Sequence, residues 1–226
     1  MTIIEKIFSP FTSFHHKRIY RYLSDLNIDM IIDIGAHEGE FLETMLKIEK
    51  IKTFYAFEPQ KDIFVKLNKK FSKNKKITLF NYAMDKEVSN KRLQINKLSM
   101  TSSLAEINEK SVYLKLKNFL TFSKKNFIDE YEIQTNTVDK VFEGINLHKT
   151  LLKIDVEGYE MNVIKGSLGK LKEIPFVLLE NQFGNHYKNN NFNEIENILL
   201  QEKFSVSKKF LFPTMHYQDV LFKKKV

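Results

Sequence analysis

A glycine-containing turn at residues 31–41 is the first part of the chain whose residue types could do chemistry. It reads IIDIGAHEGEF, and the residues of interest within it are Asp33, Gly35, Ala36, His37 and Gly39. An apolar run precedes the turn, and apolar residues recur at helical spacing after it. The segment therefore predicts a strand, a glycine turn and a helix, an arrangement that is typical of sites for nucleotide-like ligands.

The charges of this turn indicate which nucleotide-like ligand fits. A dinucleotide fingerprint has the spacing G-x-G-x-x-G, whereas here Gly35 and Gly39 are accompanied by Glu38 and Glu40, which would repel a pyrophosphate. S-adenosylmethionine carries no phosphate, and its methionine end brings an ammonium and a sulfonium. We therefore expect this donor, with Glu58 accepting hydrogen bonds from both ribose hydroxyls. A plain strand-to-helix turn, with Glu58 merely ending a strand, is the structural alternative.

A second group of polar residues follows two later apolar runs. Asp155 and Glu157 come after one run, and Glu180 and Asn181 end the next. Because the carboxyl ends of parallel strands meet at one edge of a sheet, we expect these side chains to converge. Methylation of a hydroxyl is helped by a base or a metal ion, so Asp155 and Glu180 are candidate catalytic residues. With Asn181 they also form an oxygen-rich set that magnesium prefers.

One loop histidine and three aromatic residues complete the candidates. His186, in the polar loop after Glu180, is a candidate general base, or else an exposed histidine without catalytic duty. Asp155 could alternatively hold the ammonium of the donor, and Glu157 could favour the N-terminus of a helix. Three aromatic residues could form an acceptor wall or pack in a core: Phe122, Phe127 and Tyr131.

Alternating strand and helix patterns must position these residues. Short apolar runs predict strands at Met30–Ile34, Thr53–Glu58, Ile77–Tyr82, Leu151–Asp155 and Phe176–Glu180. Helical patterns lie at Glu40–Ile48, Lys61–Phe71 and Phe192–Gln201. Two last runs, Phe204–Ser207 and Tyr217–Phe222, predict an antiparallel hairpin. The alternation predicts an α/β fold, a mostly parallel sheet with helices on both faces.

The expected domain organisation is one large domain with additions. A chain of 226 residues with 42% hydrophobic residues can bury a full core. We expect a helical segment at residues 1–29 and one domain at 30–226. An insertion at 84–138, with strand patterns at Arg92–Ile95 and Tyr131–Thr137 around a lysine-rich middle, is expected to cover the active-site edge.

Composition narrows the class of protein further. The chain has no cysteine, which excludes a disulfide framework and a thiolate metal site and fits a reducing compartment. Neither a signal peptide nor a membrane span is visible, so we expect a soluble, cytoplasmic protein. The net charge of +8 comes mostly from scattered lysines, which favours solvated faces over a groove that follows nucleic-acid phosphates. Oligomeric state is not indicated.

Several sequence blocks make the chain resemble the FkbM family of S-adenosylmethionine-dependent methyltransferases. In order they are IDIGAHEGEF, FYAFEPQ, NYAMDKE, SMTSSL, TNTVDKVF and LLKIDVEGYEMNVIKG followed by FVLLEN. The resemblance runs from about Met30 to the closing DVLF. It implies a Rossmann-like class I methyltransferase fold, whose seven-stranded sheet has an antiparallel last strand. It also implies methyl transfer, usually to a hydroxyl of a carbohydrate, polysaccharide or secondary metabolite.

The resemblance also implies roles for individual residues. It assigns the methionine part of the donor to Asp33, Gly35, Ala36 and Gly39, the ribose to Glu58, and the adenine side to Asn81 and Ala83. Ser102 and Ser103 would lie on a loop near the donor or acceptor. His37 stands where the family more often has an asparagine that contacts the donor, and a neutral imidazole can still form a hydrogen bond there.

Two other classes of function remain open. A nucleic-acid methyltransferase or nucleic-acid-binding protein could use the basic surface. The chain lacks the Asn-Pro-Pro-Tyr-like block that methylation of base amino groups commonly uses. A non-catalytic relative could retain the fold, but Asp33, Glu58 and Asp155 are all present, which argues against this class.

Overall fold

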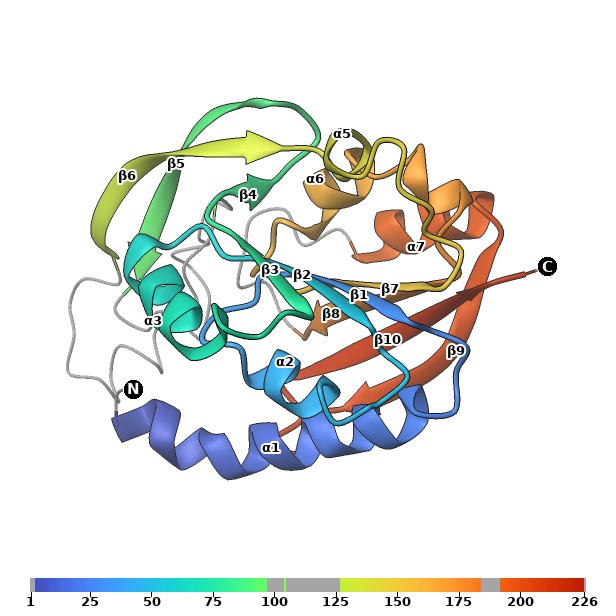
Figure 1. Ribbon diagram of the computed structural model, residues 1–226, viewed down its shortest axis with the longest axis horizontal. Helices are drawn as coiled ribbons and strands as arrows, with labels where there is room; N and C mark the ends of the chain where they lie inside the picture. Colours follow the sequence, from blue (N-terminus) through green and yellow to red (C-terminus); the bar gives the residue numbers. More distant parts are fainter. Residues whose placement is uncertain (1–2, 97–103, 105–126, 184–191, 226) are drawn as a thin grey trace.

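A seven-stranded sheet forms the centre of the molecule, and helices cover both of its faces (Figure 1). The computed structural model describes residues 3–96, 104, 127–183 and 192–225. The seven-stranded sheet with helices on both faces confirms the expected α/β class and the expected number of strands in the sheet.

The order of the strands in this sheet is β3-β2-β1-β7-β8-β10-β9. Their bounds are β1 Met30–Ile34, β2 Thr53–Phe57, β3 Ile77–Phe80, β7 Thr150–Ile154, β8 Phe176–Gln182, β9 Phe204–Leu211 and β10 Tyr217–Lys224. Neighbours from β3 to β8 pair in parallel, whereas β10 runs antiparallel to both β8 and β9. The last strand is therefore antiparallel, as expected. Chain order reverses between β1 and β7, the place where ligands bind in open α/β sheets.

The helices divide between the two faces of the sheet. Their bounds are α1 Ile3–Leu23, α2 Glu40–Met45, α3 Lys61–Phe71, α5 Val138–Val141, α6 Glu160–Lys165, α7 Phe192–Gln201 and the short 3₁₀ helix Lys170–Lys172. Successive strand residues point to opposite faces. Ile31 of β1 thus packs in one apolar cluster with α1, α2 and α3, while Ile32 packs in another with α5, α6 and α7. The molecule has three layers.

Two strands, β8 and β9, extend beyond their predicted bounds because their backbones pair with β10. β8 continues two residues past Glu180 because Gln182 pairs with Tyr217 of β10. β9 continues to Leu211 because that residue pairs with Gln218. Polar residues begin each extension, Asn181 in β8 and Lys208 in β9, so the apolar pattern breaks off although backbone pairing continues the strand. By contrast, α3 has the predicted bounds, because its apolar stripe is buried at helical spacing.

A second, three-stranded sheet is formed by β4 Ala83–Met84, β5 Ser89–Asn96 and β6 Phe127–Asn136. β4 pairs parallel to β6, and β5 pairs antiparallel to β6. The strand pattern expected at 92–95 lies within β5, and the one expected at 131–137 lies within β6 except for Thr137, which caps α5. The lysine-rich middle between them lies largely outside the described residues.

A buried polar contact joins this small sheet to the loop after β7. Lys91 Nζ lies 2.5 Å from Asp85 Oδ2, and the Tyr159 hydroxyl donates to Asp85 Oδ1 at 3.0 Å. Lys91 also donates to the Tyr159 oxygen at 2.9 Å. Gly166 supports the same junction, because a Cβ there would lie 1.9 Å from the backbone oxygen of Asp85. The small sheet is thus held against the segment that carries Glu157.

The N-terminal helix α1 runs along the edge of the molecule beside α2 and β9 (Figure 1). Tyr22 bonds the Ser207 hydroxyl of β9 at 3.1 Å, and its ring packs against Phe210. Within the described ranges of the chain, no helix has both the length and the apolar character needed to cross a membrane.

Candidate active site

The turn after β1 requires glycine at two positions. Gly35 and Gly39 have φ angles of 86° and 85°, in the left-handed region. A Cβ on Gly35 would lie 1.8 Å from the backbone oxygen of Asp155, and a Cβ on Gly39 would lie 2.3 Å from the Phe71 ring. The glycines therefore let the turn contact the tip of β7 on one side and α3 on the other.

Glu58, one residue past the end of β2, binds the backbone of this turn through its carboxylate. Its Oε2 accepts a 2.9 Å hydrogen bond from the backbone N–H of His37, and its Oε1 accepts one of 2.8 Å from Gln60. Only 3% of Glu58 is exposed. Burial raises the pKa of its carboxyl to about 7, although both backbone bonds act in the opposite direction. Each oxygen retains a further acceptor position for a ligand hydroxyl.

His37 itself lies in the left-handed region, with a φ of 48°. Its Nδ1 is 3.6 Å from Glu40 Oε2. Burial lowers the pKa of His37, but the contact with Glu40 outweighs burial and leaves the pKa above its usual value. The imidazole is thus held by an acid of the first turn of α2. The backbone N–H of His37 is bound to Glu58.

Asn81 and Ala83, assigned to the adenine side, have structural contacts in this region. The Asn81 side chain donates to the carbonyls of Glu58 at 2.8 Å and Pro59 at 3.2 Å. It therefore fixes the backbone that follows β2. Ala83 is buried in the core of the small sheet, with Leu93 and Ile133.

A buried ion pair joins β1 to β7. Asp33 is fully buried, and its Oδ1 accepts a 2.9 Å hydrogen bond from Lys153 Nζ. The same ammonium lies 3.3 Å from Asp155 Oδ2 and donates to the Gly35 carbonyl at 3.3 Å. Burial raises the pKa of Asp33, and Lys153 partly offsets that effect. Asp33 Oδ2 has no hydrogen-bond partner among the described residues. The Lys153 ammonium thus links the strand, the glycine turn and the tip of β7.

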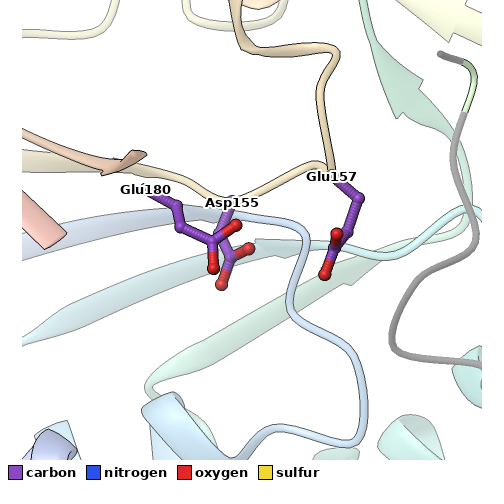
Figure 2. Close-up of side chains that lie close together, drawn as sticks. All are labelled: Asp155, Glu157 and Glu180. Carbon is purple, nitrogen blue, oxygen red and sulfur yellow. The ribbon is translucent and has the colours of Figure 1, made fainter. Parts of the chain in front are cut away.

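Three carboxylates meet at the tips of β7 and β8. One oxygen each from Asp155, Glu157 and Glu180 lies within 4.8 Å of the others, and Figure 2 shows their side chains drawn together from two segments. Glu157 reaches this position because its backbone is left-handed, with a φ of 55°. We call these three residues the acidic cluster. Its oxygen atoms could hold a divalent cation or share a proton.

Gln182 is the amide that contacts the acidic cluster. Its Nε2 donates to Glu157 Oε2 at 2.7 Å and to Glu180 Oε2 at 2.9 Å. Side chains alternate along β8, so Glu180 and Gln182 share one face of the sheet. Asn181 lies on the opposite face, on the same side as Val177 and Leu179. Of the three residues expected to form a magnesium site, Asp155 and Glu180 lie together. Gln182, and not Asn181, is the amide beside them.

The electrostatic environment of the acidic cluster favours protonation. Burial raises the pKa of Glu180 well above its usual range, and the charges of Asp155 and Glu157 add to the effect. Burial likewise raises the pKa of Tyr217 on the neighbouring strand, and Asp219 and Glu180 raise it further. Glu180 thus takes up a proton at a higher pH than an exposed glutamate does, while the Tyr217 hydroxyl stays protonated.

Sequence reasoning missed the residues that α1 and β10 contribute. His15 Nε2 lies 2.6 Å from Asp219 Oδ2, and His15 is fully buried. The His15 ring also contacts Tyr217, with centroids 5.7 Å apart. His16 packs edge-to-face on Phe41 of α2. No local motif marks these residues, because the contacts join opposite ends of the chain.

Some predicted site residues lie outside the described residues. They are His186, Ser102, Ser103 and Phe122. Phe127 begins β6, and the Tyr131 hydroxyl accepts a 2.7 Å hydrogen bond from the backbone N–H of Lys61 at the start of α3. Tyr131 therefore joins the small sheet to α3, and its role as an acceptor wall stays a prediction.

Solved structures share this fold at low sequence identity. Sp1610 of Streptococcus pneumoniae, in complex with S-adenosyl-L-methionine, has a TM-score of 0.53 at 10% identity over 92% of this chain and 71% of its own. Aeropyrum pernix fibrillarin with natively bound S-adenosyl-L-methionine gives 0.51 at 8% identity, over 94% and 76%. The Methanococcus jannaschii fibrillarin pre-rRNA processing protein gives 0.50 at 11%, over 88% and 67%. The sheet therefore has the Rossmann-like methyltransferase fold.

A search of curated proteins finds no match to this sequence.

The sequence does match a family model over most of its length. The model of the methyltransferase FkbM domain matches residues 33–206, which include the glycine turn, Glu58, Lys153 and the acidic cluster. The match begins at Asp33, so α1 lies outside it, although α1 packs against the site. Because the match covers well over half of the chain and the fold agrees with it, the protein belongs to the FkbM family of methyltransferases.

Proposed function

We propose that the protein transfers a methyl group from S-adenosylmethionine to a hydroxyl oxygen of a carbohydrate, polysaccharide or secondary-metabolite acceptor. The acidic cluster carries this proposal, because it holds proton acceptors next to the glycine turn that the donor would occupy. A sugar hydroxyl is a poor nucleophile at neutral pH, so its methylation is helped by such a group.

The residues of the turn fit the donor. Glu58 presents acceptor positions for the two ribose hydroxyls. Asp33 supports the methionine part indirectly, by holding the Lys153 ammonium that binds the Gly35 carbonyl. The roles of Ala36, Gly39, Asn81, Ala83 and Ser103 in donor binding belong to the same proposal. Glu38 and Glu40 favour a cationic nucleoside over one that carries a pyrophosphate.

The reaction is an in-line displacement at carbon. The donor supplies a methyl carbon that its sulfonium activates. The acceptor oxygen forms the new C–O bond as the C–S bond breaks, and the acceptor proton passes to a carboxylate of the acidic cluster. Glu180 suits this step, because its raised pKa makes it a stronger base than an exposed glutamate. Asp155, which belongs to the acidic cluster and also contacts Lys153, then orients the acceptor and donor relative to each other.

A magnesium ion is the alternative to a shared proton at the acidic cluster. Three carboxylate oxygens within 4.8 Å of one another are ligands of the kind that magnesium prefers. The ion would neutralise the cluster and lower the pKa of a bound acceptor hydroxyl. The Gln182 amide already donates hydrogen bonds to an oxygen of Glu157 and an oxygen of Glu180, which leaves these two atoms less available to a metal ion.

The charge at the site favours a neutral acceptor. Asp155, Glu157, Glu180 and Asp219 lie close enough to affect one another electrostatically, and they would repel the phosphates of a nucleic acid. The insertion at 84–138 would cover this edge, since Tyr159 ties the small sheet to the loop that carries Glu157. A nucleic-acid acceptor is the second candidate, because a pre-rRNA processing protein is among the structures of similar fold.

The proposal is tested by methyl transfer from radiolabelled S-adenosylmethionine to neutral oligosaccharides, phosphorylated sugars and RNA, each with and without magnesium. We expect label in a neutral polyol and its loss in Glu180→Gln. The matched control Glu49→Gln, at an exposed position, should retain activity. Transfer to RNA alone would establish the second candidate. Absence of donor binding in calorimetry would overturn both.

A further inference from the structure

Helix α1 is fixed on the sheet beside the candidate active site, although it lies outside the family match. His15 bonds Asp219 at 2.6 Å, and neither residue exposes more than 8% of its surface. Arg18 donates from Nη1 to the Leu211 carbonyl at 2.7 Å. These contacts set which side of α1 faces the sheet, and they bring His16 to the tips of β1 and β7.

His16 lies among charged groups of the donor region. Its ring centroid is 5.6 Å from that of Phe41, two residues after Gly39, and Lys153 Nζ lies 5.2 Å from the centre of the same Phe41 ring. The charged or titratable groups that act on the imidazole are Lys153, His15, Asp155 and Glu40. Within the described part of the chain, no hydrogen bond satisfies either nitrogen of His16. The imidazole is therefore available to a ligand.

The sheet order fixes the direction in which the proposed donor must lie. Glu58 follows β2 and Asp155 follows β7, with the glycine turn of β1 between them. A donor whose ribose is bound by Glu58 and whose methyl group faces Asp155 places its methionine end over the tips of β1 and β7. That end carries an ammonium and a carboxylate. The carboxylate must therefore be accommodated near Phe41 and His16.

Most charges near this position are unsuitable for a carboxylate. Glu38, Glu40 and Asp155 would repel it. The cations around the turn already pair with acids: Lys153 with Asp33 and Asp155, His37 with Glu40, and Lys66 with Glu38. We infer that His16 binds the methionine carboxylate of the donor through an imidazole N–H. This inference rests on the proposed function, and it makes α1 part of the donor site.

Binding of a carboxylate would change the protonation of His16. Burial, together with the charges of Lys153 and His15, lowers its pKa to about 4, against the opposing effects of Asp155 and Glu40. The unliganded imidazole is thus neutral at pH 7 and has one N–H to donate. A bound carboxylate stabilises the imidazolium and raises the pKa.

The test compares two nucleosides that differ only in the carboxylate. S-adenosylhomocysteine and its decarboxylated analogue, which keeps the ammonium, are titrated calorimetrically into the wild-type protein and into His16→Leu and His16→Gln. We expect the wild type to prefer S-adenosylhomocysteine by about tenfold to a hundredfold, the range of a charge-assisted hydrogen bond. His16→Leu should bring this ratio to about one. His16→Gln, which keeps an N–H donor, should give an intermediate ratio. The matched control His148→Leu, at an exposed loop position, should keep the wild-type ratio.

The ratio is measured within one protein preparation, so a general loss of stability does not alter it. An unchanged preference for S-adenosylhomocysteine in His16→Leu would overturn this inference and leave the proposed function intact. If His16→Leu failed to fold, the ratio in His16→Gln would decide in the same way. If the wild type bound neither nucleoside, the proposed function would fail, and the inference with it.

Discussion

Lys153 donates a 2.9 Å hydrogen bond to Asp33 across the pairing of β7 with β1, and both side chains are withdrawn from water. The two residues occupy partner positions in adjacent parallel strands. Neither charge would be tolerated there without the other, because an isolated charge in a buried site keeps little hydration. The pair therefore fixes the register of the two strands whose tips carry the glycine turn and Asp155.

Lys153→Met should destabilise the protein by about 3 to 5 kcal/mol, because it leaves the Asp33 carboxylate buried and unpaired. The free energy of unfolding, measured with urea, checks this value. Adding Asp33→Asn to Lys153→Met should recover much of the loss, since the second change removes the orphaned charge. Equal instability of the single and double variants would contradict a paired role.

Glu58→Ala should weaken the binding of S-adenosylmethionine by about 1.5 to 3 kcal/mol, the range for hydrogen bonds to a charged group. The variant also loses the carboxylate that binds the backbone N–H groups of His37 and Gln60. Calorimetric titration measures the loss, with the exposed Glu49→Gln as the control. An unchanged dissociation constant would remove Glu58 from the ribose site.

Glu58 should also make stability depend on pH. Burial raises its pKa from 4.5 to about 7, so the folded protein holds this proton more tightly than the unfolded chain. The stabilisation is complete below pH 4.5 and is lost as the pH rises through 7. Glu58→Gln removes this term. The wild type should therefore lose on the order of 3 kcal/mol relative to the variant over that interval. Parallel stability curves in urea would contradict the raised pKa.

Glu180→Gln should reduce turnover by about 10² to 10⁴ while the donor still binds, because a glutamine cannot accept the acceptor proton. In the wild type, turnover should rise as the pH passes upward through the raised pKa of Glu180. Steady-state rates across pH, together with calorimetric donor affinities, separate the two effects. A variant that loses donor affinity in proportion to turnover would place Glu180 in donor binding.

Neighbouring amides on β8 give a test of the face that carries the chemistry. Gln182→Leu should alter turnover and its pH dependence, because Gln182 donates hydrogen bonds to both Glu157 and Glu180. Asn181→Leu, on the opposite face, should affect them much less. If magnesium-dependent activity were lost in Asn181→Leu alone, Asn181 would be a metal ligand and the geometry of the strand tip would differ in the working enzyme.

The sequence predicts most of the sheet because its local signals agree. β1 has the predicted bounds, since a short apolar run that carries a single acid, Asp33, and ends at a glycine turn fits a buried strand. α3 likewise begins and ends as predicted. Asp155 and Glu180 could be brought together in advance, because parallel strands end at a common edge.

The remainder of the site depends on contacts that leave no local pattern. Lys153 lies within an apolar run, where its pairing with Asp33 depends on strand order and not on spacing. His15 and Asp219 are 204 residues apart, and each alone resembles an ordinary polar residue. Gln182 could not be distinguished from Asn181 without knowing that β8 extends two residues past Glu180.

The contact between His15 and Asp219 also bears on the order of folding. It joins α1 to β10, so this contact cannot form until the two segments meet. Contacts between such distant segments tend to form late, because they close a loop that includes most of the chain. During synthesis, α1 leaves the ribosome long before β10 does, so the side of the donor region that His16 would complete forms only after β10 has been made.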